Sequence, residues 1–273
     1  QIPGIRKENG NWNEDLLKSL GVFCNVNSLI NDIGNLSYDV IQKYEREAGK
    51  RLSESKTTSI VCQVIMDSWQ RGYKKENGET DFHQYIGISS SLQTLINFSD
   101  SSPEITYDII NEPNFLETIN IILTTILPSY LQGEEQAEDK KVMKNCLIIY
   151  ANTSKVSRNI SHLRSLKIVP IFNVFLHAKE EINRLYALST LANIIDEKDS
   201  VILQNKSDVV ALLLNILKSA VEDKAHRNNG YSAEECAMTV RNLARNDKNK
   251  KLLVQMKCLP PLVELAKCGN VEE

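Results

Sequence analysis

The sequence predicts an all-α fold built from repeated units of three helices. Its 273 residues include only 11 glycines and 7 prolines, and the hydrophobic fraction of 42% is ordinary for a globular chain. A short pattern ending in asparagine returns four times, and amphipathic stretches follow it. A repeat length of about 20–50 residues is typical of stacked helical units, because one small unit cannot bury its apolar face alone.

The pattern has asparagine at its seventh position. The three best copies also begin with a small residue, and they read "CLIIYAN" (146–152), "ALSTLAN" (187–193) and "CAMTVRN" (236–242). A fourth copy, "SLQTLIN" (91–97), shares the fifth and seventh positions. The four asparagines are 55, 41 and 49 residues apart, and they are Asn97, Asn152, Asn193 and Asn242.

The stretches after each copy predict the other helices of the unit. A polar turn leads to one apolar segment, and a second break leads to a strongly amphipathic one, at 168–176, 209–217 and 259–267. Pro170 and Pro260 stand near the start of this second helix, where a missing N–H costs nothing. The variation in spacing lies in two polar stretches, 128–141 and 218–233, which we expect to be loops between the second and third helices.

A three-helix unit of this length that closes with small-x-x-x-aliphatic-x-Asn resembles the armadillo repeat. The last copy, residues 234–273, is similar to the family pattern over nearly its entire length. The resemblance implies a right-handed α–α superhelix, an armadillo-type solenoid like those of importin-α and β-catenin. It covers residues 83–273, where the last repeat is incomplete, so we expect a fragment of a larger protein.

Residues 1–82 contain no clean copy of the pattern. Segments 37–52 and 58–73 have the apolar spacing of amphipathic helices. We interpret this region as divergent N-terminal helices, either degenerate repeats or a cap.

The resemblance also implies a partner-binding surface. In such a superhelix the third helices line a concave groove, and their asparagines hold the backbone of an extended peptide, since an amide both donates and accepts. The candidate partner-binding residues are Asn97, Asn152, Asn193 and Asn242, with Arg241 and Arg245 beside the last of them. The alternative is that these asparagines brace the fold itself, and the sequence leaves both roles open.

One turn before the asparagines, importin-α-like grooves carry tryptophans that sandwich lysine side chains. Here those positions are held by Gln93, Ile148, Ser189 and Met238. The sequence therefore argues against recognition of a basic nuclear-localisation peptide in that manner.

No motif for catalysis, metal binding or a cofactor is found. The four histidines are scattered, and none of the six cysteines forms a C-x-x-C pair, which favours a reducing cytoplasmic or nucleocytoplasmic setting. A net charge of −3 argues against a nucleic-acid partner. The longest apolar runs are shorter than the roughly 20 residues that cross a membrane.

The resemblance implies two alternative functions. The first is a non-enzymatic scaffold that binds a protein or extended peptide along the concave groove. The alternative is the regulatory armadillo region of a multidomain signalling enzyme, such as a TIR-domain NADase or a ubiquitin ligase, with a linked effector domain outside this chain. Self-association through uncapped ends is a further expectation.

Overall fold

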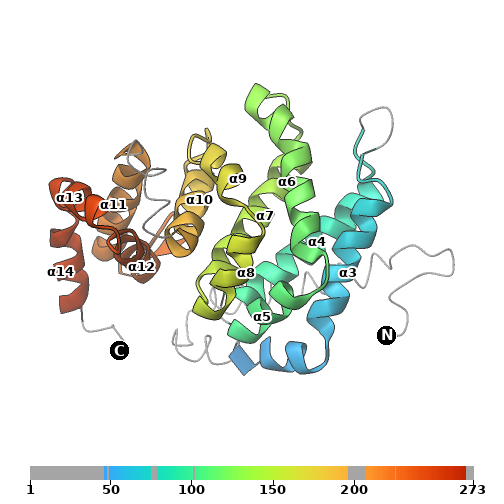
Figure 1. Cartoon of the computed structure of the whole chain (residues 1–273), viewed down its shortest axis with the longest axis horizontal. Helices are drawn as coiled ribbons and strands as arrows, with labels where there is room; N and C mark the ends of the chain where they lie inside the picture. The colour runs from blue at the N-terminus through green and yellow to red at the C-terminus, as the bar shows by residue number, and fades with distance from the viewer. Residues whose placement is uncertain are drawn as a thin grey trace. The chain divides into compact units, whose positions relative to one another are not determined.

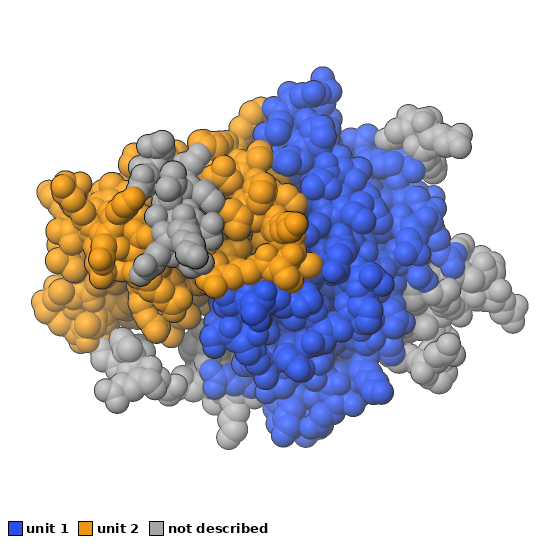
Figure 2. Space-filling model, viewed as in Figure 1, with its two compact units in different colours: residues 1–162 blue, residues 163–273 orange. Residues whose placement is uncertain are grey.

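The computed structural model describes residues 46–47, 49–74, 79–100, 102–195, 207–224 and 226–268. These residues are mostly helical, as predicted, and their one sheet is a two-stranded hairpin (Figure 1). The chain divides into two compact units, residues 1–162 and 163–273 (Figure 2). Each unit is described below by itself.

Unit 1 contains a short helical segment followed by a series of longer helices. Residues 49–54 are helical, and the elements after them are α3 (Thr57–Gln70), α4 (Phe82–Ser99), α5 (Pro103–Asn111), α6 (Phe115–Gln132), α7 (Ala137–Ser154) and η1 (Ser157–Asn159). Helix α3 packs on α4 and α6, while α4 packs along α7 and α6 packs on α7. Helix α3 thus adjoins α6, and α4 adjoins α7. By their order in the predicted three-helix unit, we call α3 and α6 second helices and α4 and α7 third helices. The boundary between the units falls within α8 (Ile160–Ser165).

The helices of unit 1 begin and end where their sequence provides capping groups. The Asp81 carboxylate accepts the first backbone N–H groups of α4, and Ser102 does the same for α5, whose first residue is Pro103. A Cβ on Gly49 would lie 2.4 Å from the Cβ of Ser102, so only glycine lets the first helix approach α5 this closely. The apolar stripes between these ends form the core, where Ile88 is fully buried.

Unit 2 contains α9 (Val169–Phe175), α10 (Glu181–Ile194), α11 (Ser207–Glu222), α12 (Ala233–Leu243), α13 (Asp247–Gln255) and α14 (Leu259–Lys267). Helix α10 packs on α9, α11 and α12, and α12 packs on α11, α13 and α14. The third helices α10 and α12 are therefore neighbours, like α4 and α7 in unit 1. Pro170 and Pro260 lie in the first turns of α9 and α14, as predicted.

The loop predicted at 128–141 is wrong in part, because α6 continues through Pro128 to Gln132. Proline removes one backbone hydrogen bond, but Tyr130 beyond it is buried and holds the last turn on the core. The helix stops at Gly133, which has a φ of 77°. Glu134 N donates to Ser129 O at 2.9 Å, which closes this end in a Schellman arrangement.

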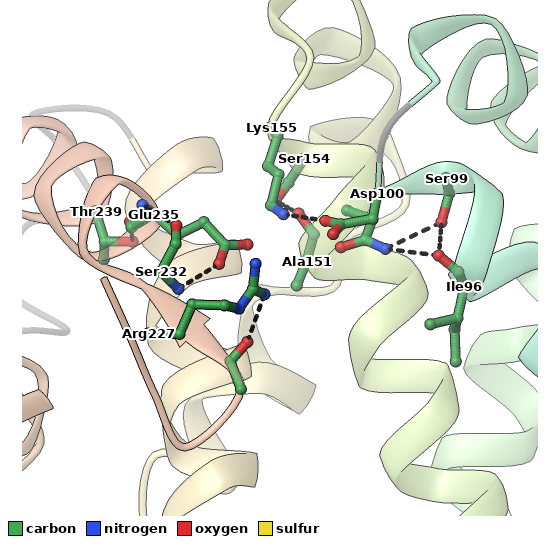
Figure 3. Close-up of polar contacts among 12 residues, drawn as sticks. Ile96, Ser99, Asp100, Ala151, Ser154, Lys155, Arg227, Ser232, Glu235 and Thr239 are labelled. Carbon is green, nitrogen blue, oxygen red and sulfur yellow. Dashed lines mark hydrogen bonds and ion pairs between the residues drawn. The ribbon is translucent and has the colours of Figure 1, made fainter. Parts of the chain in front are cut away.

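The loop predicted at 218–233 is also shorter than expected, and part of it is a hairpin. Helix α11 runs to Glu222, and β1 (Arg227–Asn228) then pairs with β2 (Tyr231–Ser232). Asn229 and Gly230 make the turn with φ values of 49° and 83°, and this geometry matches the right-handed twist of paired strands. The Ser232 side chain and Glu235 then form a capping box that starts α12 (Figure 3).

A local backbone feature recurs before four second helices. Lys56, Asn114, Lys167 and Lys257 all have φ between 52° and 61°, and they lie one or two residues before α3, α6, α9 and α14. These are unusual backbone angles for residues other than glycine. The first of them belongs to the region without a sequence copy, so the turn recurs where the asparagine pattern does not.

The helix predicted at 58–73 is confirmed as α3, whereas residues 37–45 of the other predicted helix lie outside the described residues.

Candidate functional site

The four asparagines of the repeated pattern all lie in the last turn of a third helix. Asn97 and Asn152 are two residues before the ends of α4 and α7, and Asn193 and Asn242 are one residue before the ends of α10 and α12. The low helix propensity of asparagine costs little at a helix end. Because α4 packs along α7 and α10 packs on α12, the structure brings the asparagine helices together as one pair in each unit.

In unit 1, Asn152 joins α7 to the end of α4 by hydrogen bonds. Its side chain is 5% exposed, and Nδ2 donates to Ser99 Oγ at 3.0 Å and to Ile96 O at 3.4 Å. Both acceptors belong to the last turn of α4, where backbone carbonyls run short of helical partners. Figure 3 shows Ile96 and Ser99 at this contact, with the ion pair of Lys155 and Asp100 at 2.6 Å nearby.

Asn97, on the neighbouring helix α4, is half-buried. Its Oδ1 accepts a hydrogen bond from Gln93 Nε2 at 2.8 Å, one turn earlier in α4. Within the part of the chain that the structure describes, its Nδ2 makes no bond. Asn97 therefore keeps one donor for another molecule, whereas Asn152 uses its donor inside the unit.

In unit 2, the two asparagines bond to each other. Asn242 Nδ2 donates to Asn193 Oδ1 at 2.5 Å, and both residues are half-buried. One turn earlier, Thr239 Oγ1 lies 3.2 Å from Ser189 Oγ, so a second polar contact joins the same two helices. The Oδ1 atom of Asn242 has no bond among the described residues and remains an acceptor.

Two arginines extend this surface of unit 2. Arg241 and Arg245 are exposed, and neither forms an ion pair with a described residue. Each guanidinium can bind a carboxylate or backbone carbonyls through several N–H groups at once. The end of α12 therefore offers one amide oxygen and two unpaired cations on adjacent positions.

A second set of asparagines, missed in the sequence, closes the third helices. Asn159 and Asn249 are 1% and 7% exposed, and their Nδ2 atoms donate to Thr153 O at 3.0 Å and Leu243 O at 3.1 Å. Each stands seven residues after a repeated asparagine and bonds the carbonyl of the residue next to it. That shared offset was visible in the sequence. In α10 the last carbonyl is instead bonded by Arg164 Nε, at 2.6 Å.

Unit 1 also contains a buried carboxylate, that of Asp139 near the start of α7, a residue that is 4% exposed. Tyr73 OH donates to Asp139 Oδ1 at 2.8 Å, and Lys74 Nζ lies 2.9 Å from Oδ2. Burial and this hydrogen bond to a carboxylate raise the pKa of Tyr73. The cluster attaches the segment after α3 to α7, and its groups satisfy one another.

Most of the described thiols are buried and offer little nucleophilic chemistry. Cys62, Cys146, Cys236 and Cys258 are buried, as expected of cysteines on apolar stripes, while Cys268 is exposed and Cys24 lies outside the described residues. Burial, with a smaller contribution from Glu235, raises the pKa of Cys236 to about 12. The reactive thiolate is thus scarce at neutral pH.

The described part of the chain carries no candidate metal site and no candidate membrane span. No group of three His, Cys, Asp or Glu side chains is placed to hold a metal ion. None of the helices combines the length and apolarity needed to cross a bilayer. Comparison with known proteins finds no protein-family model and no curated protein that matches this chain.

Proposed function

We propose that this chain is a non-enzymatic protein-interaction module of the armadillo type. In this proposal its three-helix repeats form a right-handed superhelix, and an extended segment of a partner protein binds over the ends of the third helices. The observation that carries the proposal is the packing of third helices as neighbours in both units, each with an asparagine in its last turn.

The spacing of such helices suits an extended chain. Packed helices lie about 8–10 Å apart, and an extended chain advances about 3.3 Å per residue. Asparagines on neighbouring helices would then contact backbone groups about three residues apart. This recognition requires no particular side chains on the partner, because an amide pairs with the peptide group itself.

The polar groups left open by the internal bonds define how the partner would bind. In unit 1, Asn97 would supply a donor. In unit 2, Asn242 would supply an acceptor, and Arg241 and Arg245 would bind carbonyl or carboxylate oxygens. Asn193 receives the bond that orients Asn242. Asn152 acts as a brace that holds the helix beside Asn97 in position.

A peptide selection tests this function. Random 16-residue peptides displayed on phage are selected against the purified chain, and the affinity of the best ones is measured by calorimetry. We expect the double substitution Asn242→Ala with Arg245→Ala to weaken binding at least tenfold, or about 1.4 kcal/mol. The melting temperature should fall by no more than a few degrees, because Asn242→Ala removes one hydrogen bond, to Asn193, and Arg245 is exposed.

The matched control is Lys218→Ala, which removes an exposed cation from α11 in the same unit. It should leave the affinity unchanged. The proposal fails if the selected peptides bind the double variant as tightly as the wild-type chain, or if the selection returns no peptide with a Kd below about 100 μM, since weaker binding is hard to separate from non-specific contact.

A further inference from the structure

Helix α6 of unit 1 (Figure 1) exposes a side without charged groups. Of its 18 residues, Glu117 alone is charged. Ile121 and Leu131 are 53% and 57% exposed, and Thr124 and Pro128 between them are also exposed. These last four residues follow one another at intervals of three or four, so they lie on one side of the helix. We call Ile121, Thr124, Pro128 and Leu131 the α6 face.

The α6 face also lacks free hydrogen-bond donors. Thr124 Oγ1 donates to the backbone of its own helix, with Asn120 O at 2.9 Å and Ile121 O at 3.1 Å. The hydroxyl proton is therefore used inside the helix. Pro128 has neither an N–H nor a polar side chain. With no charge and no open donor, the α6 face favours an apolar occupant.

The outward sides of two other second helices are polar. Residues at the same spacing on α3 and α11 carry amide or charged groups, and they are Gln63, Asp67 and Gln70 on α3 and Asp208, Asn215, Lys218 and Glu222 on α11. Such groups keep the outer side of a helix solvated. The inner side of α6 is already covered, since α6 packs on α3, α5 and α7. The apolar outer side is thus particular to α6 and lies within unit 1.

We propose that the α6 face is a self-association site, where the α6 helices of two copies of the chain pack antiparallel about a two-fold axis. With that axis beside residue 126, Ile121 of one copy faces Leu131 of the other, and Thr124 faces Pro128. The large aliphatic side chains then meet at both ends of the contact. The smaller ones meet in the middle, where they allow the helix axes to approach to about 8–10 Å.

The charges of α6 and its surroundings fit a second copy. A two-fold dimer opposes equal faces, so a charged face would repel itself, whereas the α6 face has no charge. Glu117 lies beyond one end of the face, and Glu135 and Lys140 form an ion pair of 2.9 Å beyond the other end. The antiparallel arrangement brings Glu117 of one copy to that ion pair of the other. There the Glu135 side chain is 5% exposed and the Lys140 side chain is 51% exposed, so the accessible charge is opposite to that of Glu117.

The size of the contact predicts a weak dimer. At 1.5 Å for each of its 18 residues, α6 is about 27 Å long. One helix from each copy buries less than the roughly 1,200 Å² at which stable interfaces begin. We therefore expect a reversible dimer with a Kd of about 10–300 μM.

Sedimentation equilibrium of the full 273-residue chain, between about 5 and 500 μM, measures this association. Leu131→Glu and Ile121→Glu should each weaken it at least about tenfold, because each puts two carboxylates into an apolar contact. Leu259→Glu is the matched control and should leave the Kd unchanged, since Leu259 is 54% exposed but lies on α14 in unit 2. Circular dichroism checks that each variant remains folded.

Disulfide formation tests the antiparallel arrangement. In a chain that carries Cys24→Ser and Cys268→Ser, the variants Thr124→Cys and Pro128→Cys are mixed in equal amounts and oxidised. The mixed dimer should exceed the half expected from random pairing, because a disulfide requires Cα atoms within about 7 Å and residues 124 and 128 face each other. A parallel pair would instead favour dimers of a single variant.

The proposal is overturned if the chain stays monomeric up to about 500 μM, or if Leu131→Glu and Ile121→Glu both leave the Kd unchanged. It is also overturned if Leu259→Glu weakens the dimer as much as Leu131→Glu does, or if the mixed disulfide is the minor product. The α6 face contains none of the proposed peptide-binding residues, so failure of this proposal and failure of the proposed function are distinguishable.

Discussion

The brace made by Asn152 permits a quantitative prediction. Alanine at this position removes the hydrogen bonds to Ser99 Oγ and Ile96 O, in a place that is 5% exposed and where water cannot replace the amide. Ser99 keeps its own bond to Ile96 O at 3.3 Å, so no hydroxyl is left without a partner. With about 1 kcal/mol for each lost bond, the free energy of unfolding of unit 1 should fall by about 2 kcal/mol.

Urea and thermal unfolding, followed by circular dichroism at 222 nm, measure this loss. For a unit of this size, about 2 kcal/mol corresponds to a fall in Tm of roughly 4–8 °C. The control is Asn111→Ala, at the exposed end of α5, whose amide bonds only Tyr107 O of its own helix and whose loss should cost less than about 0.5 kcal/mol. Equal stability of the two variants would show that Asn152 does not join α7 to α4.

Two further predictions concern buried titratable groups. Burial raises the pKa of Tyr150, so the folded chain retains a proton that the unfolded chain loses above its ordinary pKa of about 10. The free energy of unfolding should therefore fall as pH rises past about 10, and less steeply in Tyr150→Phe, as shown by urea midpoints measured at several pH values. In the variant Cys24→Ser at pH 8, the exposed Cys268 should react at once with a thiol reagent, and the buried Cys236 should react only after unfolding. A second thiol that reacts as fast as Cys268 would contradict the burial of the other cysteines.

Helix positions followed from apolar spacing where the periodic signal was strong. Segment 259–267 coincides with α14, and 168–176 differs from α9 by one residue at each end. The third helices also end close to the repeated asparagines. Local pattern was sufficient in these places because each helix has one apolar stripe, flanked by proline or by a polar turn.

The two misjudged loops show where local pattern fails. The polar stretch that begins at Pro128 was predicted to be a loop, but α6 continues through it, because the burial of Tyr130 outweighs one lost backbone bond. The hairpin after α11 depends on Asn229 and Gly230, whose dipeptide is a recognised turn signal, but the flanking strands are only two residues each. Strands this short carry too little alternation to be seen in a sequence.

The sequence identified the asparagines as candidate site residues, but it did not predict the hydrogen bonds that each of them makes. The period predicted that the asparagines stand on equivalent helices, and it could not predict which atoms each amide bonds. Asn152 is used inside unit 1, whereas Asn97 and Asn242 each retain one open polar atom, because burial differs between the helices that carry them. The helix-closing pair Asn159 and Asn249 could have been found from their common offset in the sequence.

The asparagines that donate to the last carbonyls of α7 and α12 determine where the chain can be truncated without loss of a helix end. Their acceptors, Thr153 O and Leu243 O, belong to one helix, while the donors Asn159 and Asn249 come from the element that follows. A shortened chain that stops at the apparent helix end would leave those carbonyls bare, and its last turn would fray. A truncated chain should therefore end after the asparagine that donates to the helix end, and not at the helix end itself. The boundary between the two units, after His162, likewise lies beyond Asn159.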